Sequence, residues 1–79
     1  MSIITVYTAP SCQQCRLTEA RRAERRLTFR IIRLENEPAI ATRLREQGFI
    51  QAPVVQVHGD KPQMWAGFRP DLFDALPHT

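Results

Sequence analysis

The sequence predicts one small α/β domain, a four-stranded mixed sheet with three helices in the order β-α-β-α-β-β-α and helices on both faces. Three observations predict it. The chain has 79 residues, which is enough for one domain and too few for a second core. Segments rich in β-branched residues alternate with helix-forming segments, as in a parallel β-α-β crossover. The last two β-rich segments are separated only by a short turn, which indicates a hairpin.

The first half of the chain supplies the predicted β-α-β unit. Residues 2–8 are rich in β-branched residues, and Ala9-Pro10 ends this strand. Ser11 and Gln14 match a capping box, so a helix is expected with Ser11 as N-cap, continuing to about Leu27. A second strand is predicted at 29–34. The inward stripe of the helix is predicted to comprise Leu17, Ala20, Glu24 and Leu27, with Glu24, a poor core residue, at its margin.

A second helix is expected after the second strand. Asn36 is a favoured capping residue, and Pro38 is suited to the first helical turn. Ile40 and Leu44 of this helix are expected to point inward. Gly48 is well placed to end it in the left-handed conformation.

The remainder is predicted as a hairpin followed by a short helix. Residues 54–57 and 63–66 form its strands, and 58–61 form the turn between them. Pro70 opens the last helix, which is expected to continue to about Leu76. This plan uses nearly the whole chain.

The composition excludes several classes of protein. Hydrophobic residues make up 43% and charged residues 24%, which fits a globular domain and not a disordered chain. No apolar run approaches the roughly 18 residues of a membrane span. The first residues also lack the pattern of a signal peptide, so a cytoplasmic protein without a membrane partner is expected.

The net charge is +3, and five of the ten arginines lie between Arg16 and Arg26. We interpret this segment as a solvated helix face. A docking patch for an acidic protein is the first alternative. Nucleic-acid binding is the second, but no aromatic residues that could stack on bases are interleaved with the arginines, so no nucleic-acid partner is expected.

The two cysteines, Cys12 and Cys15, lie three positions apart. A disulfide between them would close a very small loop and add little stability, which directs attention to their chemistry. The predicted helix places Cys12 at N1 and Cys15 at N4, on neighbouring positions. The helix N-terminus favours a thiolate at Cys12. A C-x-x-C beside a β-α-β pattern is typical of thioredoxin-like redox sites, with Cys12 attacking a disulfide and Cys15 resolving the intermediate.

Other interpretations of the cysteines involve no redox chemistry. They could be two inert core residues. They could also bind zinc, but the other available ligands, His58 and His78, are about 20 residues apart, unlike the spacing of zinc fingers. Covalent haem attachment is excluded because Arg16, not histidine, follows the second cysteine. No metal is expected.

Two further segments could contribute to a site. Pro53 precedes the third strand, either as a strand-start proline or as a cis-proline that exposes neighbouring backbone to a substrate strand. In the segment 65–70, core packing of Trp65 and Phe68 is the default, and an exposed ring would anchor a partner. Gly67 indicates a positive φ or a close backbone approach.

Together these motifs resemble one family over nearly the whole chain. The matching stretches are Val6-Tyr7-Thr8, Cys12-Gln13-Gln14-Cys15, Gln47-Gly48-Phe49, Ala52-Pro53-Val54-Val55 and Trp65-Ala66-Gly67-Phe68-Arg69-Pro70-Asp71. They are similar to the NrdH-type redoxins, the glutaredoxin-like hydrogen donors of class Ib ribonucleotide reductase. Two positions depart from the usual pattern. Gln13 stands where the family usually has valine, and Ala66 where it usually has serine or threonine.

The resemblance implies a thioredoxin-like fold, in its minimal glutaredoxin form, as a single domain over residues 1–79 with Pro53 in the cis form. It implies a redox-active Cys12–Cys15 pair, no bound cofactor, and a monomer. Electrons would come from NADPH through thioredoxin reductase and pass to the large subunit of class Ib ribonucleotide reductase. Partner contacts are expected from Tyr7, Pro10, Gln13, Gln14, Ala52, Pro53, Trp65, Gly67, Phe68 and Arg69.

Two other functions remain as alternatives. The first is a glutathione-dependent glutaredoxin. Glutaredoxins hold glutathione with a Gly-Gly pair and an acid, and here Gly67-Phe68 lacks the second glycine while Phe68 and Arg69 add bulk. The second, from another class, is a small basic binding module in which the cysteines are incidental.

Overall fold

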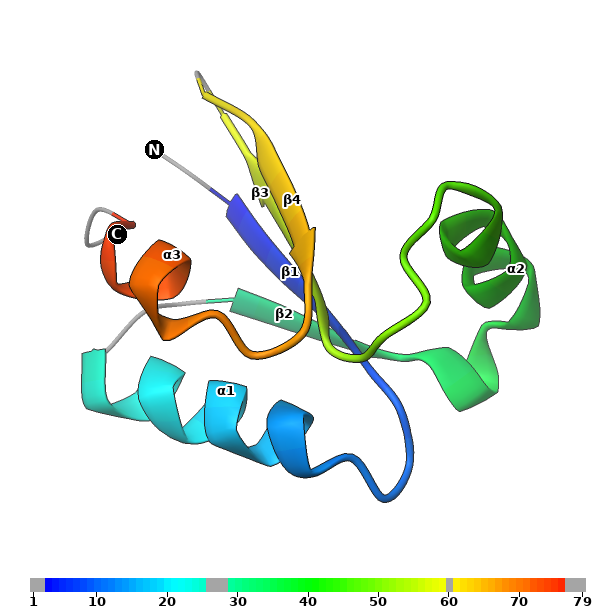
Figure 1. The fold of residues 1–79 in the computed structure, drawn as a ribbon, viewed down its shortest axis with the longest axis horizontal. Helices are drawn as coiled ribbons and strands as arrows, with labels where there is room; N and C mark the ends of the chain where they lie inside the picture. Colours follow the sequence, from blue (N-terminus) through cyan, green and yellow to red (C-terminus); the bar gives the residue numbers. More distant parts are fainter. Residues whose placement is uncertain (1–2, 26–28, 60, 77–79) are drawn as a thin grey trace.

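The computed structural model describes residues 3–25, 29–59 and 61–76. The elements follow the predicted order (Figure 1). They are β1 (Ile3–Thr8), α1 (Gln13–Arg25), β2 (Phe29–Arg33), the 3₁₀ turn η1 (Leu34–Asn36), α2 (Pro38–Glu46), β3 (Val54–His58), β4 (Gln63–Ala66) and α3 (Pro70–Asp74). Strand β2 is one residue shorter than predicted because Leu34 begins η1, and His58 ends β3 instead of lying in the turn.

The four strands form one mixed sheet in the order β2-β1-β3-β4. Strand β1 pairs in parallel with β2 and antiparallel with β3, and β3 pairs antiparallel with β4. Helices α1 and α3 lie on one side of the sheet and α2 on the other (Figure 1). The predicted four-stranded mixed sheet with helices on both faces is therefore confirmed.

The main core fills the space between the sheet and the α1–α3 side. Alternate residues of a strand point to the same face, and most of the residues on this face are apolar. Leu76, which follows α3, is only 3% exposed and closes the core at its end. Phe29 and Leu72 pack against the cluster. The buried cluster comprises Ile4, Val6, Val55, Val57, Trp65 and Leu76.

Helix α1 begins one residue later than predicted. The backbone N–H of Arg16 donates to the Cys12 carbonyl at 3.3 Å, so Cys12 is the N-cap and Ser11 lies outside the helix. Ser11 has φ +54°, a left-handed conformation, whereas an N-cap residue is normally extended. The predicted capping box is therefore wrong: Cys12 is at the cap and Cys15 at N3, and Gln14 is free to bond elsewhere.

The inward face of α1 also differs from the predicted stripe. Thr18 is 2% exposed, whereas Leu17 is 41% exposed and Ala20 is exposed as well. Glu24 is exposed, in keeping with its predicted place at the margin. Thr18 can be buried because its hydroxyl donates to the backbone carbonyl of Gln14 at 2.9 Å. Leu27, the fourth predicted member, lies outside the described residues. The spacing of hydrophobic residues therefore predicted the wrong face of α1. The buried face contains Thr18, a polar residue whose hydroxyl already has a hydrogen-bond partner.

Of the predictions for the two ends of α2, one is wrong and one is confirmed. Glu37, not Asn36, is the N-cap, without a side-chain hydrogen bond, because Asn36 is taken up in η1. Gly48 has φ +94°, as expected for the residue that ends the helix. Its N–H bonds Arg45 O at 3.0 Å and the N–H of Phe49 bonds Leu44 O at 2.9 Å, which is the Schellman pattern.

Pro38 opens α2 as predicted, and Leu44 is its buried residue while Ile40 is partly buried. Helix α3 ends at Asp74, two residues earlier than expected. Among the described helices, none combines the length and apolarity that crossing a bilayer requires.

Candidate active site

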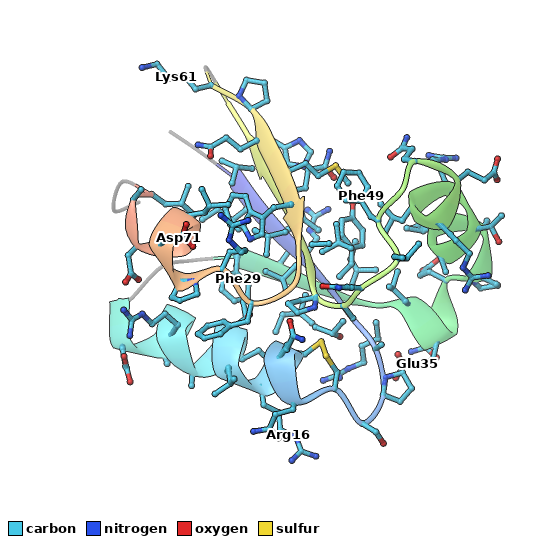
Figure 2. The ribbon with its side chains drawn as sticks, in the orientation of Figure 1. Arg16, Phe29, Glu35, Phe49, Lys61 and Asp71 are labelled. Carbon is cyan, nitrogen blue, oxygen red and sulfur yellow. A yellow bond between two sulfur atoms is a disulfide. The ribbon has the colours of Figure 1, made fainter. Side chains whose placement is uncertain are left out.

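Cys12 and Cys15 form a disulfide at the start of α1, and their Cα atoms are 5.2 Å apart. Figure 2 shows this bond in yellow at the beginning of the helix, near Arg16. Cys12 is partly exposed, whereas Cys15 is 4% exposed. Only the first sulfur is therefore accessible to a large partner, and the second is placed to attack from inside the protein.

The environment of Cys12 favours negative charge on its sulfur. The backbone N–H of Cys15 donates to Cys12 Sγ at 3.0 Å, the same bond that an oxygen makes in an ordinary N-cap. The first turn of α1 contains no acidic residue. The helix N-terminus and this donor both stabilise a thiolate, so Cys12 is suited to nucleophilic attack when the pair is reduced.

The cis-proline loop lies beside the segment 65–70. The Ala52–Pro53 peptide bond is cis, as the resemblance implied, and the Pro53 side chain is fully buried. The N–H of Gly67 donates to the Pro53 carbonyl at 2.7 Å. This bond fixes the loop before β3 to the segment after β4.

Gly67 is the point at which three segments meet. It is buried with φ +86°, which confirms the positive φ expected there. A Cβ at this position would lie 3.0 Å from Gln51 Oε1 and 3.2 Å from Gln14 Oε1. Gln14 Oε1 also accepts a hydrogen bond from the N–H of Phe68 at 2.8 Å. The helix start that carries the dithiol is thereby joined to the cis-proline loop and to the segment 65–70.

The aromatic residues of this segment differ in exposure. Trp65 is 7% exposed and belongs to the core, so its ring is not a surface anchor. Phe68 is partly exposed. Arg69 is exposed, and its guanidinium donates two hydrogen bonds to the carboxylate of Asp71, at 3.2 and 3.0 Å. These bonds lower the pKa of the Asp71 carboxyl below its ordinary value.

The structure does not bring every predicted contact residue to the dithiol. Tyr7 faces α2, where its hydroxyl donates to Gln56 Oε1 at 2.9 Å in a pocket separate from that of the cysteines. Pro10 is exposed and lines the pocket of the cysteines. Gln13 is exposed on the first turn of α1, and Ala52 is partly exposed in the cis-proline loop.

Three residues near these segments were not among the predicted contact residues, although Thr8 belongs to the matching stretch Val6-Tyr7-Thr8. Gln51 approaches Gly67, Ile50 is 79% exposed beside the cis-proline loop, and Thr8 lines the pocket that contains both cysteines. The only signal for Gln51 and Ile50 was their position just before Ala52-Pro53. Within residues 3–25, 29–59 and 61–76, no group of three His, Cys, Asp or Glu side chains could hold a metal ion.

Comparison with known proteins gives one consistent family, although no family model matches the chain. The chain is 42% identical over 79 residues to the glutaredoxin-like protein NrdH of Escherichia coli K12, covering 96% of this chain and 94% of that one. It is 41% identical over 76 residues to the NrdH protein of Salmonella typhimurium LT2, covering 96% and 90%.

Solved structures agree with this likeness. The NrdH-redoxin of Escherichia coli, a glutaredoxin-like protein described as having a thioredoxin-like activity profile, superimposes with a TM-score of 0.86 at 40% identity over 98% of this chain and 97% of that one. The thioredoxin-like protein BC3987 superimposes with a TM-score of 0.74 at 22% identity and covers 90% of this chain and 94% of that one, which supports the fold alone. The chain therefore belongs to the NrdH glutaredoxin-like proteins, and it is a thiol–disulfide oxidoreductase of thioredoxin-like fold with Cys12 and Cys15 as its redox-active pair.

Proposed function

We propose that this protein is a small electron carrier that reduces protein disulfides in the cytoplasm. It acts as a monomer, takes electrons from NADPH through thioredoxin reductase, and passes them to the large subunit of a class Ib ribonucleotide reductase. The observation that carries the proposal is the asymmetry of the pair. Cys12 is accessible and its sulfur accepts a hydrogen bond from the N–H of Cys15, whereas Cys15 is buried.

The exchange proceeds in two steps. The Cys12 thiolate attacks one sulfur of the target disulfide, forms a mixed disulfide, and releases the other target sulfur as a thiolate. The Cys15 thiol then gives up its proton and attacks Cys12 Sγ. The second target thiolate leaves with its electron pair, and the Cys12–Cys15 disulfide forms. Two electrons have passed to the target, and the dithiol of a reductase restores the carrier by the same steps in reverse.

Three features support thioredoxin reductase over glutathione as the electron source. The N–H of Phe68 already bonds Gln14 Oε1, so it is not available to a glutathione backbone. The space above Gly67 is closed by Gln14 and Gln51. The Escherichia coli NrdH-redoxin, which this structure resembles, is described as thioredoxin-like in its activity profile. No observation favours a basic binding module with incidental cysteines.

Two coupled assays of insulin reduction test the electron source. One contains NADPH and thioredoxin reductase, and the other contains NADPH, glutathione and glutathione reductase. We expect NADPH oxidation in the first assay and little in the second, and none with Cys12→Ser in either. Activity confined to the glutathione system would refute the proposed donor.

The electron acceptor needs its own test. Reduced carrier is mixed with the oxidised large subunit of a class Ib ribonucleotide reductase, and free thiols of the subunit are counted. We expect two new thiols per subunit at rates that the Cys12→Ser variant does not support. If insulin is reduced but the subunit is not, the carrier function stands and the proposed acceptor is wrong.

A further inference from the structure

The hydroxyl of Thr8 is buried without a partner. Thr8 ends β1 and is 3% exposed, and its Oγ1 has no hydrogen-bond partner within the described part of the chain. Buried hydroxyls in proteins are nearly always bonded. Thr18, which is buried in α1, follows this rule by bonding the carbonyl of Gln14. Because this hydroxyl lies in the pocket of a redox pair, a group that becomes an acceptor only in another redox state could satisfy it.

The position of Thr8 identifies that partner. Thr8 points to the same face of β1 as Val6, toward α1, and it lines one pocket together with Cys12 and Cys15. Cys15 is 4% exposed, so water solvates its sulfur poorly. A buried thiol that must ionise and a buried hydroxyl without a partner thus share one pocket.

We propose that the Thr8 hydroxyl donates a hydrogen bond to Cys15 Sγ once the Cys12–Cys15 bond opens, and that this bond stabilises the Cys15 thiolate. In the disulfide the Cys15 sulfur is held by Cys12, and it is a weak acceptor. In the reduced form and in the mixed disulfide it is released, and as a thiolate it is a strong acceptor. The inference rests on the two-step exchange proposed above, and it holds whichever proteins donate and accept the electrons.

The other polar groups of the pocket are poorer candidates. Arg16 and Glu19 of α1 and Arg33 of β2 line it as well. The two arginines favour a thiolate and Glu19 opposes it, but both arginines are exposed and Glu19 is only partly buried, so water and salt weaken their effect. Ser11 is also exposed. Thr8 is the buried donor of the set.

The proposal predicts a characteristic pH dependence. A hydrogen bond to a charged group changes a pKa by about one to two units, so removing the hydroxyl raises the pKa of Cys15 by that amount. A thiolate of higher pKa is also more nucleophilic, which offsets about half of the effect. The rate of attack by Cys15 therefore falls by about threefold to tenfold near neutral pH, and it equals or exceeds that of the wild type in alkali.

The experiment follows both cysteines in one reaction. Reduced protein is mixed with the aromatic disulfide dithiobis(nitrobenzoate) in a stopped-flow instrument. Attack by Cys12 releases one thionitrobenzoate at a rate proportional to the reagent concentration. Attack by Cys15 on the resulting mixed disulfide releases the second at a rate independent of that concentration.

Both rates are measured across the pH range for wild type, Thr8→Val and Thr8→Ser. Thr5→Val, which removes a buried hydroxyl from the opposite face of β1, is the matched control.

We expect Thr8→Val to shift the pH profile of the second step upward and to leave the first step unchanged. Thr8→Ser and Thr5→Val should follow the wild type. A Thr8→Val profile that superimposes on the wild type overturns the proposal, as does an upward shift of equal size in Thr5→Val. A wild type that releases only one thionitrobenzoate per molecule would instead refute the two-step exchange.

Discussion

At the scale of single residues, the sulfur of Cys12 takes the place that an oxygen usually occupies at a helix N-cap. Its donor is the N–H of Cys15, at 3.0 Å. The same bond that caps the helix therefore stabilises the nucleophile. Cys15, which supplies the donor, is itself buried, and in the proposed exchange it serves the second step.

The division of labour between the two cysteines can be tested by replacing each with serine. Cys12→Ser is expected to abolish disulfide reduction, because no accessible thiolate remains. Cys15→Ser is expected to attack once and then to stay attached to its target, because no second thiol releases it. Mass spectrometry of the products checks this. Normal turnover by Cys15→Ser would contradict the two-cysteine mechanism.

Gly67 and Gly48 form a matched pair for a test of the contact between three segments. Both have positive φ, but a Cβ meets Gln51 and Gln14 at Gly67 and nothing within 4 Å at Gly48. Gly48→Ala is expected to cost about 1 kcal/mol of unfolding free energy through its backbone conformation alone. Gly67→Ala is expected to cost about 1 kcal/mol more, because Gln14 must move away from the N–H of Phe68.

Denaturant unfolding measures both costs, and the coupled assay with thioredoxin reductase measures function. We expect Gly67→Ala to impair the coupling and Gly48→Ala to leave it intact. Equal losses of stability and activity in the two variants would show that the side chains around Gly67 have no special role.

At the scale of secondary-structure elements, short-range signals predicted more than long-range ones. The order of elements, the hairpin and the Gly48 helix end follow from local chain chemistry, and the structure has all three. The cap of α1 and the buried face of α1 do not follow from local chain chemistry, and both predictions were wrong. Ser11 is the better capping residue by type, but its left-handed backbone excludes it.

The contacts around Gly67 also lie beyond sequence reasoning. Gln14 meets Phe68 across 54 positions of the chain. Gln51 approaches Gly67 because β3 and β4 are antiparallel, so the loop before β3 and the segment after β4 lie at the same end of the sheet. No spacing or motif within a single sequence specifies such a contact. The dithiol itself was predictable because its spacing of three carries the chemistry.

Helix α3 is held by ion pairs at both ends. Arg21 of α1 makes two bonds to the Asp74 carboxylate, which also raise the pKa of the Arg21 guanidinium. At the other end, Arg69 pairs with Asp71 in the first turn. Only the Arg21–Asp74 pair links α3 to another element, because Arg69 and Asp71 are two positions apart. Both pairs are accessible to solvent, so each adds little to the stability of the fold.

The Arg69–Asp71 pair makes a prediction about acid stability. The hydrogen bonds from Arg69 lower the pKa of the Asp71 carboxyl, so the folded state favours the ionised carboxylate. The resulting stabilisation is complete above the ordinary pKa of aspartate and is lost as the pH falls through the lower, folded value. Asp71→Asn is therefore expected to lower Tm slightly near neutral pH and to match the wild type in strong acid.

Thermal melts across this pH range measure the difference, and Arg69→Gln serves as the partner variant. If the pair is responsible, the double variant melts no lower than either single variant. A Tm difference between Asp71→Asn and wild type that persists in strong acid would exclude the carboxylate charge as its cause.

At the scale of the whole molecule, a chain of 79 residues has little stability to spare. The disulfide spans only three positions, so it constrains the unfolded chain weakly. The fold therefore depends on the cluster between the sheet and the α1–α3 side. The apolar side chain of Ile50 lies outside that cluster, 79% exposed beside the cis-proline loop.

Substitutions at Leu76 and Ile50 test separately whether an apolar side chain stabilises the core or contacts a partner protein. Leu76→Ala is expected to cost about 2–5 kcal/mol, a large part of the stability of so small a domain, because it empties a site in the core. Ile50→Ala is expected to change stability by less than about 0.5 kcal/mol. It should nevertheless raise KM for thioredoxin reductase about fivefold, as expected when a partner loses one buried apolar anchor. Thermal melts and the coupled assay measure the two effects independently. An unchanged KM in Ile50→Ala would remove the cis-proline loop from the docking surface, because no other large apolar side chain of the described loop is as exposed.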